Sequence, residues 1–230
     1  MRPETEVDSI SLDGVAVVRD GRAILRDVSV HLTAPRIAVI GPNGSGKSTF
    51  ARLLNALVRP SSGRVRVHGL DAERDTAALR RRVGFVFTDP QAQILMPTPA
   101  EDLALSLWGE PRAEIERQVA ETLEAHGLAA HADVPASELS GGQKQMLALA
   151  SVLISRPRLI VADEPTTLLD LRNARRIAEL LLTLPMQVVI VTHDLDLAAR
   201  CDEVLLFDEG RLVASGEPAP VIAAYRDLCA

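Results

Sequence analysis

The sequence predicts an α/β fold that has an antiparallel β edge and an all-helical insertion near residues 90–155. Three observations predict this architecture. Short β-branched runs indicate buried strands, residues 7–32 alternate between apolar and polar, and residues 99–156 contain no strand pattern. At 230 residues, the chain suits one domain, or one domain with a subdomain.

The antiparallel edge is expected at the beginning of the chain. Alternating apolar residues in the segment 7–32 flank a turn at Asp20-Gly21, which is the pattern of paired strands. A further edge strand is expected at residues 65–68. Near the other end of the chain, residues 204–214 predict a hairpin that turns at Glu209-Gly210.

The central strands share short apolar runs, mostly of β-branched residues, and they are expected at residues 36–40, 83–87, 159–162 and 188–191. A first helix is expected over residues 49–58, before Pro60. Its apolar positions at helical spacing are Phe50, Leu53, Leu54 and Leu57. In the insertion, Gly127 stops a helix whose apolar face carries Ile115, Val119 and Leu123.

Composition narrows the class of protein. The net charge of −6 disfavours a nucleic-acid partner, and the 47% of hydrophobic residues is ordinary for a globular chain. Cys201 and Cys229 lie far from any CxxC spacing, which suggests a reducing compartment. The polar beginning, MRPETEVDSI, does not resemble a secretory signal, and apolar runs such as 146–154 are too short to cross a bilayer. We therefore expect a cytoplasmic protein that reaches the inner face of a membrane through a partner.

A phosphate-binding loop is predicted at GPNGSGKST, which fits GxxxxGK[ST] between a strand and a helix. Its glycines let successive N–H groups point at phosphate oxygens. Lys47 would reach the terminal phosphates, and Ser48 would hold Mg²⁺. The alternative is a glycine-rich turn with a solvated lysine. The residues expected to bind nucleotide here are Asn43, Gly44, Ser45, Gly46, Lys47, Ser48 and Thr49.

A second phosphate motif is predicted at ELSGGQKQ, residues 138–145. Ser140 would cap the helix that starts after Gly141-Gly142, and bare N–H groups would face a γ-phosphate. The alternative is an ordinary helix cap. The nucleotide-contacting residues expected from this motif are Ser140, Gly141, Gly142 and Gln143.

An acidic pair follows in RLIVADEP. Asp163 suits Mg²⁺, and Glu164 suits a base that polarises the attacking water. His193, at another strand end, could bond the γ-phosphate. The alternatives are solvated loop acids and a structural histidine.

Together, these motifs and TLLD, which ends at Asp170, closely resemble the ATP-binding-cassette (ABC) ATPases over almost the whole chain. The resemblance implies a P-loop NTPase of ABC type, with ATP and Mg²⁺ as cofactors. It implies one domain over residues 1–230, in which a RecA-like core carries an antiparallel β subdomain and a helical subdomain at about 90–156. It also implies a head-to-tail dimer in which Ser140 of one subunit closes the site of the other. Asp170 would then communicate between the two sites.

Three positions depart from the family pattern. One is Met146, which stands where an arginine commonly follows LSGGQKQ and is expected only to pack. Where an aromatic residue usually stacks on adenine, this chain has Arg19, which either stacks on the base or is solvated. Where a glutamine usually ligates Mg²⁺, it has Thr88, which either reaches the ion or caps a turn. Gln91 and Gln93 could replace that glutamine if the loop bends at Pro90.

The segment DPQAQILMPTPAED, residues 89–102, resembles the ATPases of energy-coupling-factor transporters, which work with a transmembrane scaffold and a substrate-binding membrane subunit. The residues expected at the partner interface are Asp89, Gln93, Ile94, Leu95, Met96 and Asp170. Biotin is the expected substrate and cobalt or nickel the second choice. The alternatives are that Ile94 to Met96 pack in the core, or that the chain is an export ATPase or an ABC ATPase not linked to transport. Homodimer and pairing with a paralogue both remain open.

Overall fold

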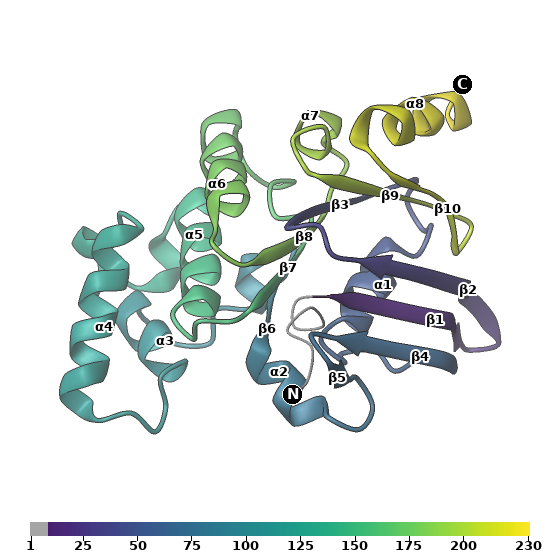
Figure 1. Cartoon of the computed structure of the whole chain (residues 1–230). Helices are drawn as coiled ribbons and strands as arrows, with labels where there is room; N and C mark the ends of the chain where they lie inside the picture. Colours follow the sequence, from purple (N-terminus) through teal and green to yellow (C-terminus); the bar gives the residue numbers. More distant parts are fainter. Residues whose placement is uncertain (1–8) are drawn as a thin grey trace.

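The computed structural model describes residues 9–230 and forms two β-sheets with helices around them (Figure 1). The predicted start of the first strand at residue 7 lies outside the described residues. The central sheet has the order β10-β9-β3-β8-β7-β6, and the second sheet has the order β2-β1-β4-β5. This arrangement confirms the predicted α/β fold with an antiparallel β part and a helical part.

The strands of the central sheet are β3 (Arg36–Ile40), β6 (Val83–Val86), β7 (Leu159–Asp163), β8 (Gln187–Val191), β9 (Glu203–Asp208) and β10 (Arg211–Gly216). All neighbours are parallel except the β9–β10 hairpin. Because both faces are covered, consecutive residues are buried on opposite sides: Ile37 and Val39 join one core cluster, and Ala38 and Ile40 join the other. Burial on both faces explains why these strands are continuous apolar runs.

The antiparallel sheet comprises β1 (Ile10–Arg19), β2 (Arg22–Leu32), β4 (Ser62–Val67) and β5 (Leu70–Asp71). β1 and β2 turn at Asp20-Gly21, where both residues have positive φ. The prediction that residues 65–68 form an edge strand is wrong, because β4 pairs with β1 on one side and with β5 on the other.

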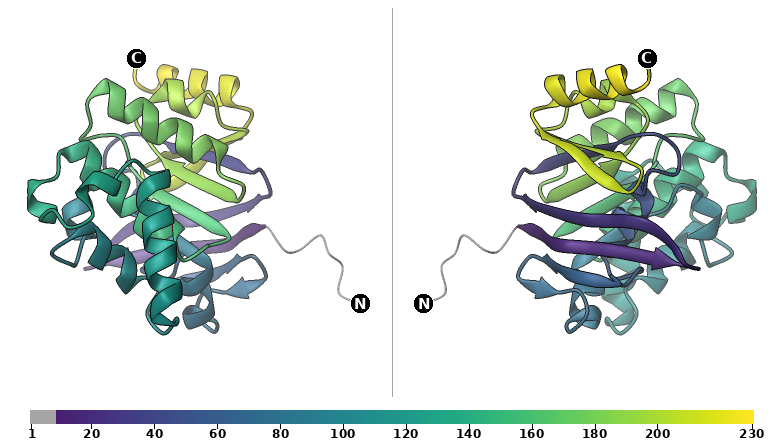
Figure 2. Two further views of the ribbon diagram at one scale, coloured as in Figure 1. Left: turned by 90° about the vertical axis from the view of Figure 1, so that its left-hand side faces the viewer. Right: turned by 90° about the vertical axis from the view of Figure 1, so that its right-hand side faces the viewer.

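The helices are α1 (Lys47–Leu53), α2 (Thr76–Arg82), α3 (Pro99–Leu105), α4 (Arg112–Ala125), α5 (Gly141–Leu153), α6 (Leu171–Thr183), α7 (Leu195–Ala198) and α8 (Pro218–Leu228). Short 3₁₀ turns are η2 (Pro90–Ala92), η3 (Ala129–His131) and η4 (Ala136–Glu138). Between β6 and β7 the chain forms only helices and turns, and these lie on the far side of the central sheet from β1 and β2 (Figure 1). Both views of Figure 2 place α8 beside the β9–β10 edge.

The first helix is shorter than predicted. It begins at Lys47 and ends at Leu53, whereas the spacing predicted 49–58. Ala56 has a φ of 56°, so the backbone leaves the helix before Leu57, whose side chain is 45% exposed instead of sharing the apolar face. Among residues 9–230, no helix has the length and apolarity that crossing a bilayer requires.

Candidate functional site

The phosphate loop connects β3 to α1 at the carboxyl end of the central sheet. Gly41, Gly44 and Gly46 all have positive φ, which glycine adopts without strain. Gly41 also lies so close to the Phe207 carbonyl that a Cβ would overlap it. Ser45 is 3% exposed, and its Oγ has no hydrogen-bond partner among the described residues. The loop is therefore packed against the sheet below it, and the Ser45 N–H donates to the Pro42 carbonyl within the loop at 3.2 Å.

Lys47 is the buried cation of this loop. Its Nζ donates to the carbonyls of Gly41 at 2.7 Å and Pro42 at 2.8 Å. Burial lowers the pKa of the Lys47 ammonium, and the nearby carboxylates of Glu164 and Asp163 oppose that shift. These two hydrogen bonds leave one of the three N–H donors of the ammonium for a terminal phosphate.

Asp163 ends β7 and is 1% exposed. Its Oδ1 accepts a hydrogen bond from Ser48 Oγ at 2.9 Å, and its Oδ2 lies 3.5 Å from the Arg52 guanidinium. A hydroxyl and a carboxylate oxygen in contact are ligands that suit Mg²⁺, so the residues present fit this ion. The sequence argument missed Arg52, although its position four residues after Ser48 puts both on one face of α1.

Glu164 follows with a φ of 54°, and its N–H donates to the Val191 carbonyl at 3.0 Å. One carboxylate oxygen accepts from Thr167 Oγ1 at 2.8 Å, and the other lies 3.0 Å from His193 Nε2. Adjacent parallel strands thus bring the acid and the histidine together, as expected for strand ends on one edge of a sheet.

These residues surround a cavity of about 330 Å³. It is lined by Ile24, Asn43, Gly44, Gly46, Lys47, Ser48, Thr49, Glu164 and His193. Ile24 was not predicted, since nothing in its sequence pattern distinguishes it from other strand residues. Arg19 does not line this cavity: it is exposed and lies opposite Arg22 at the β1–β2 turn.

Thr88 lies beside Asp163, but its hydroxyl donates to the main-chain carbonyl of that residue at 2.8 Å, not to the carboxylate. The alternative that Thr88 caps a turn is wrong, because the cap of η2 is Asp89, which accepts from the Gln91 N–H at 2.9 Å. Replacement of the usual glutamine by Gln93 is also wrong in this conformation. The Gln93 amide accepts from the Phe87 N–H and donates to the Ala148 carbonyl at 2.8 Å.

The second phosphate motif forms the beginning of α5. Ser140 is its N-cap, and a reciprocal capping box joins the Ser140 main chain to the Gln143 amide at 2.8 Å and the Gln143 N–H to Ser140 Oγ at 3.3 Å. Gly141 borders open space. None of the four residues lines the cavity around Lys47. Within one chain, the two predicted phosphate-binding surfaces are therefore separate.

Asp170 caps α6 and accepts from the N–H of Asn173 at 2.9 Å and from its side-chain amide at 2.8 Å. These hydrogen bonds lower the pKa of Asp170. A Cβ on Gly142 would overlap the Asn173 side chain, so Asn173 lies directly between Asp170 and the Ser140 turn.

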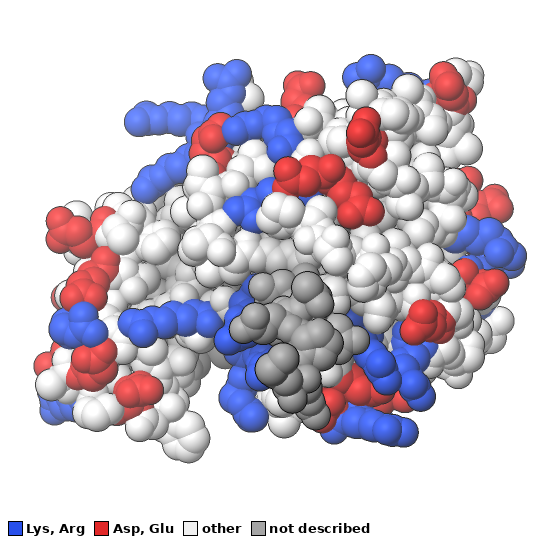
Figure 3. Space-filling model, in the orientation of Figure 1, with Lys and Arg blue, Asp and Glu red and all other residues white. Residues whose placement is uncertain are grey.

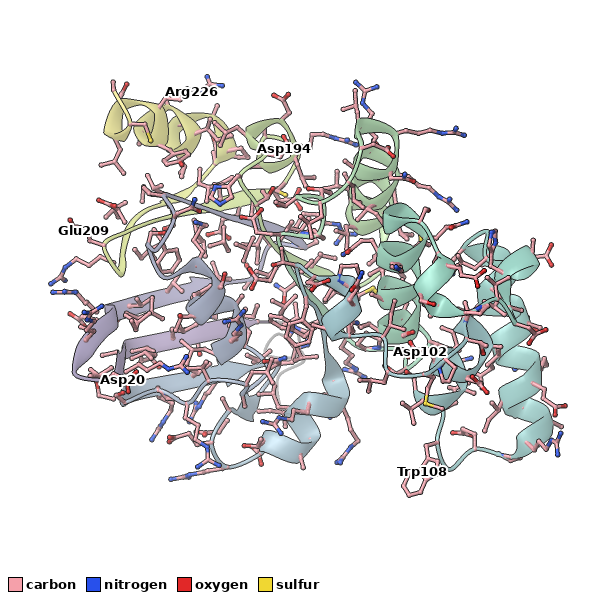
Figure 4. All side chains as sticks on the ribbon, turned by 180° about the vertical axis from the view of Figure 1, so that it is seen from behind. Asp20, Asp102, Trp108, Asp194, Glu209 and Arg226 are labelled. Atoms are coloured by element: carbon pink, nitrogen blue, oxygen red, sulfur yellow. The ribbon has the colours of Figure 1, made fainter. Side chains whose placement is uncertain are left out.

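The segment 89–102, which we call the docking segment, borders an open groove of about 630 Å³. The groove is lined by Gln91, Ile94, Leu95, Met96, Pro97, Pro135, Ala136, Ser137 and Lys144. Leu95 is 72% exposed, whereas Ile94 packs partly against the core, so the expected apolar surface is mainly that of Leu95 and Met96. Trp108, just after α3, is 91% exposed and projects from the same helical part (Figure 4).

A buried carboxylate fixes the shape of this segment. Asp102 is 4% exposed, and its Oδ1 accepts from the N–H groups of Leu95 at 2.8 Å and Met96 at 3.2 Å. Its Oδ2 accepts from Ser151 Oγ on α5 at 2.7 Å. Figure 4 shows Asp102 inside the helical part, away from the outer end where Trp108 lies. The docking segment is therefore attached to α5.

Comparison with known proteins identifies related chains. The family model described as ABC transporter matches residues 25–167. A putative ABC transporter ATP-binding protein of Deinococcus radiodurans is 49% identical over 95% of this chain and 97% of its own length. The biotin transport ATP-binding protein BioM of Rhizobium etli is 43% identical over 96% of this chain and 100% of its own. The structure of cbiO1 from Clostridium perfringens, described as part of the ABC transporter complex cbiONQ, is 30% identical, with a TM-score of 0.83 over 96% of this chain and 92% of that one.

Proposed function

This chain belongs to the ABC transporter family as an ATP-hydrolysing subunit, and we propose that it drives an energy-coupling-factor importer whose substrate is biotin. The observation that carries the choice of transporter is the similarity to BioM over 96% of this chain and 100% of BioM. The docking segment supports it, since its exposed groove gives a membrane partner an apolar contact.

The cavity around Lys47 supports a hydrolytic mechanism. Lys47 and the loop N–H groups hold the β- and γ-phosphates in place. Glu164 accepts a hydrogen bond from the attacking water and then its proton, while the bond between the γ-phosphorus and the bridging oxygen breaks. Thr167 holds one oxygen of that carboxylate, and His193, 3.0 Å from the other, would contact the γ-phosphate. Magnesium bound by Ser48 and Asp163 would neutralise the charge that develops on the phosphates.

The Ser140 surface supports a head-to-tail dimer. Because its residues do not line the cavity of their own chain, they are available to close the cavity of a second subunit. The Ser140 hydroxyl accepts from Gln143, which leaves its proton free to be donated to a γ-phosphate. Each dimer would then hold two composite sites, and Asp170 would lie between them.

The docking groove supports a scaffold contact. An apolar helix of a transmembrane partner would bury Leu95 and Met96, and burying a leucine of this kind contributes about 1.5–3 kcal/mol. Because Asp102 attaches this segment to α5, closure of the dimer would move the partner helix together with the Ser140 turn.

The test is biotin uptake by cells that depend on this chain for it. Leu95→Glu should abolish uptake and co-purification with integral membrane subunits from detergent-solubilised membranes, while basal ATP hydrolysis stays within about threefold. Leu228→Glu is the matched control, because Leu228 is 48% exposed on α8, outside the groove. If Leu95→Glu still supports uptake, the docking assignment is wrong.

The substrate is tested separately. Deleting the chain should abolish accumulation of radiolabelled biotin and leave nickel and cobalt accumulation unchanged. Loss of metal accumulation with biotin uptake intact would overturn the choice of biotin in favour of the metal importers.

A further inference from the structure

The Gln143 side chain is held at both ends of its amide. Its Oε1 accepts from the Ser140 N–H at 2.8 Å as part of the capping box. Its Nε2 lies 2.9 Å from Nε2 of His131, which ends the short turn η3 twelve residues earlier. His131 is therefore in direct contact with the turn that carries the phosphate-binding hydroxyl.

This contact selects one protonation state of His131. The capping box requires the Gln143 oxygen to face the Ser140 N–H, so the Gln143 NH₂ group has to face His131. An NH₂ group needs an acceptor, and the ring provides one at Nε2 only when the ring is neutral and its proton is on Nδ1. Nδ1 is buried and has no hydrogen-bond partner among the described residues. A second proton would consequently bind at Nε2 and oppose the Gln143 NH₂ group at 2.9 Å.

We propose that neutral His131 is a positioning residue for the ATPase reaction: it holds the Gln143 amide, and through it the Ser140 turn, in the conformation that contacts a γ-phosphate. The proposal rests on the composite site proposed above but not on the transporter or its substrate. Without the acceptor on the ring, the Gln143 amide turns or is displaced, and the capping box is lost. The Ser140 hydroxyl then has no fixed direction, and the second subunit closes less tightly on ATP.

Four titratable side chains on neighbouring elements have other hydrogen-bond partners or are exposed. Lys144 on α5 donates to the Ser137 carbonyl at 3.0 Å, and Glu101 on α3 accepts from Thr98 at 3.0 Å. On α4, the His126 ring bonds the main chain of its own helix. Asp133, two residues beyond His131, is exposed. Among the described residues, Gln143 is thus the side chain whose hydrogen bonding depends on the proton of His131.

The consequence is that removing the acceptor at position 131 weakens the closure of the second subunit on ATP. The loss of an N-cap contact sets the expected size at roughly threefold to tenfold in ATP-driven dimerisation.

The experiment compares ATP hydrolysis by the full chain carrying His131→Gln, His131→Leu or, as the matched control, His126→Gln. Glutamine keeps an acceptor near the place of the ring Nε2, whereas leucine removes it. We expect His131→Leu to hydrolyse ATP roughly threefold to tenfold more slowly than the parent and His131→Gln to recover most of that loss. His126→Gln should follow the parent.

A second measurement separates this proposal from the composite site itself. Glu164→Gln, which should bind ATP without turning it over, is passed over a gel-filtration column with ATP, alone and combined with His131→Leu. If Glu164→Gln alone forms no dimer, the composite site is wrong. If it forms a dimer and His131→Leu does not weaken that dimer, the role of His131 is wrong, whatever the transported substrate.

Discussion

Asp102 provides the sharpest test of how the docking segment is built. Asp102→Ala removes the acceptor for the N–H groups of Leu95 and Met96 and for the Ser151 hydroxyl. Hydrogen bonds to a charged group contribute about 1.5–3 kcal/mol each, but part of that sum is offset because a buried carboxylate no longer has to be desolvated. We therefore expect a loss of about 3 kcal/mol in the free energy of unfolding.

For a chain of this length, about 3 kcal/mol corresponds to a fall in Tm of roughly 6–12 °C, measured by circular dichroism. Ser151→Ala is the matched control, since it removes one donor, worth about 1.5 kcal/mol, and should lower Tm by only about 3–6 °C. Asp102→Asn keeps an acceptor for Leu95 and Met96 and should fall between the two. A Tm for Asp102→Ala within about 2 °C of the parent would mean that these contacts do not stabilise the fold, and the proposed attachment of the docking segment to α5 would be refuted.

Three further outcomes are expected. Glu164→Gln should bind ATP like the parent and hydrolyse it at least about 100-fold more slowly, whereas Lys47→Ala should lose ATP binding. Unchanged turnover by Glu164→Gln would mean that Glu164 is not the base. Because Arg19 stands where an aromatic residue usually stacks on adenine, competition binding should show less than about tenfold preference for ATP over GTP. A preference of about a hundredfold would mean that the adenine site is misplaced. Thr88→Gln should raise basal ATP hydrolysis and lower uptake, because a longer amide side chain replaces the hydroxyl that now donates to the Asp163 carbonyl. No change in hydrolysis or uptake would mean that Thr88 is a purely structural residue.

The parts of the fold that follow from short-range pattern were predictable. β3 lies at Arg36–Ile40, as its apolar run indicates, because a strand buried on both faces has to be apolar throughout. The Ser140 cap was predictable for a similar reason, since capping is decided within four residues. By contrast, α6 and α8 were not predicted, and the first helix ends early because of the backbone at Ala56, whose positive φ no local pattern indicates.

The missed contacts are those that the tertiary fold creates. Thr88 meets Asp163 only because β6 and β7 are neighbours, and that pairing takes the Thr88 hydroxyl to a carbonyl rather than to the metal side of the carboxylate. His131 meets Gln143 because η3 folds back on the beginning of α5. The motif ELSGGQKQ identified Gln143 as a site residue, but it did not indicate His131, whose ring contacts the Gln143 amide. Acidic and basic side chains are intermingled on the face shown in Figure 3, so net charge did not help to locate either site.

The hydrogen bonds of Gln93 connect the central sheet to α5. Its amide oxygen accepts from Phe87, directly after β6 of the central sheet, and its NH₂ group donates to Ala148 on α5. Asp102 joins the same helix to the docking segment through Ser151. The sheet carries the acids of the hydrolytic cavity, whereas α5 carries Ser140 at its beginning. A partner helix seated beside Leu95 would therefore be attached to the phosphate-binding turn through α5, and to the hydrolytic site through the Gln93 amide and the Thr88 hydrogen bond to Asp163.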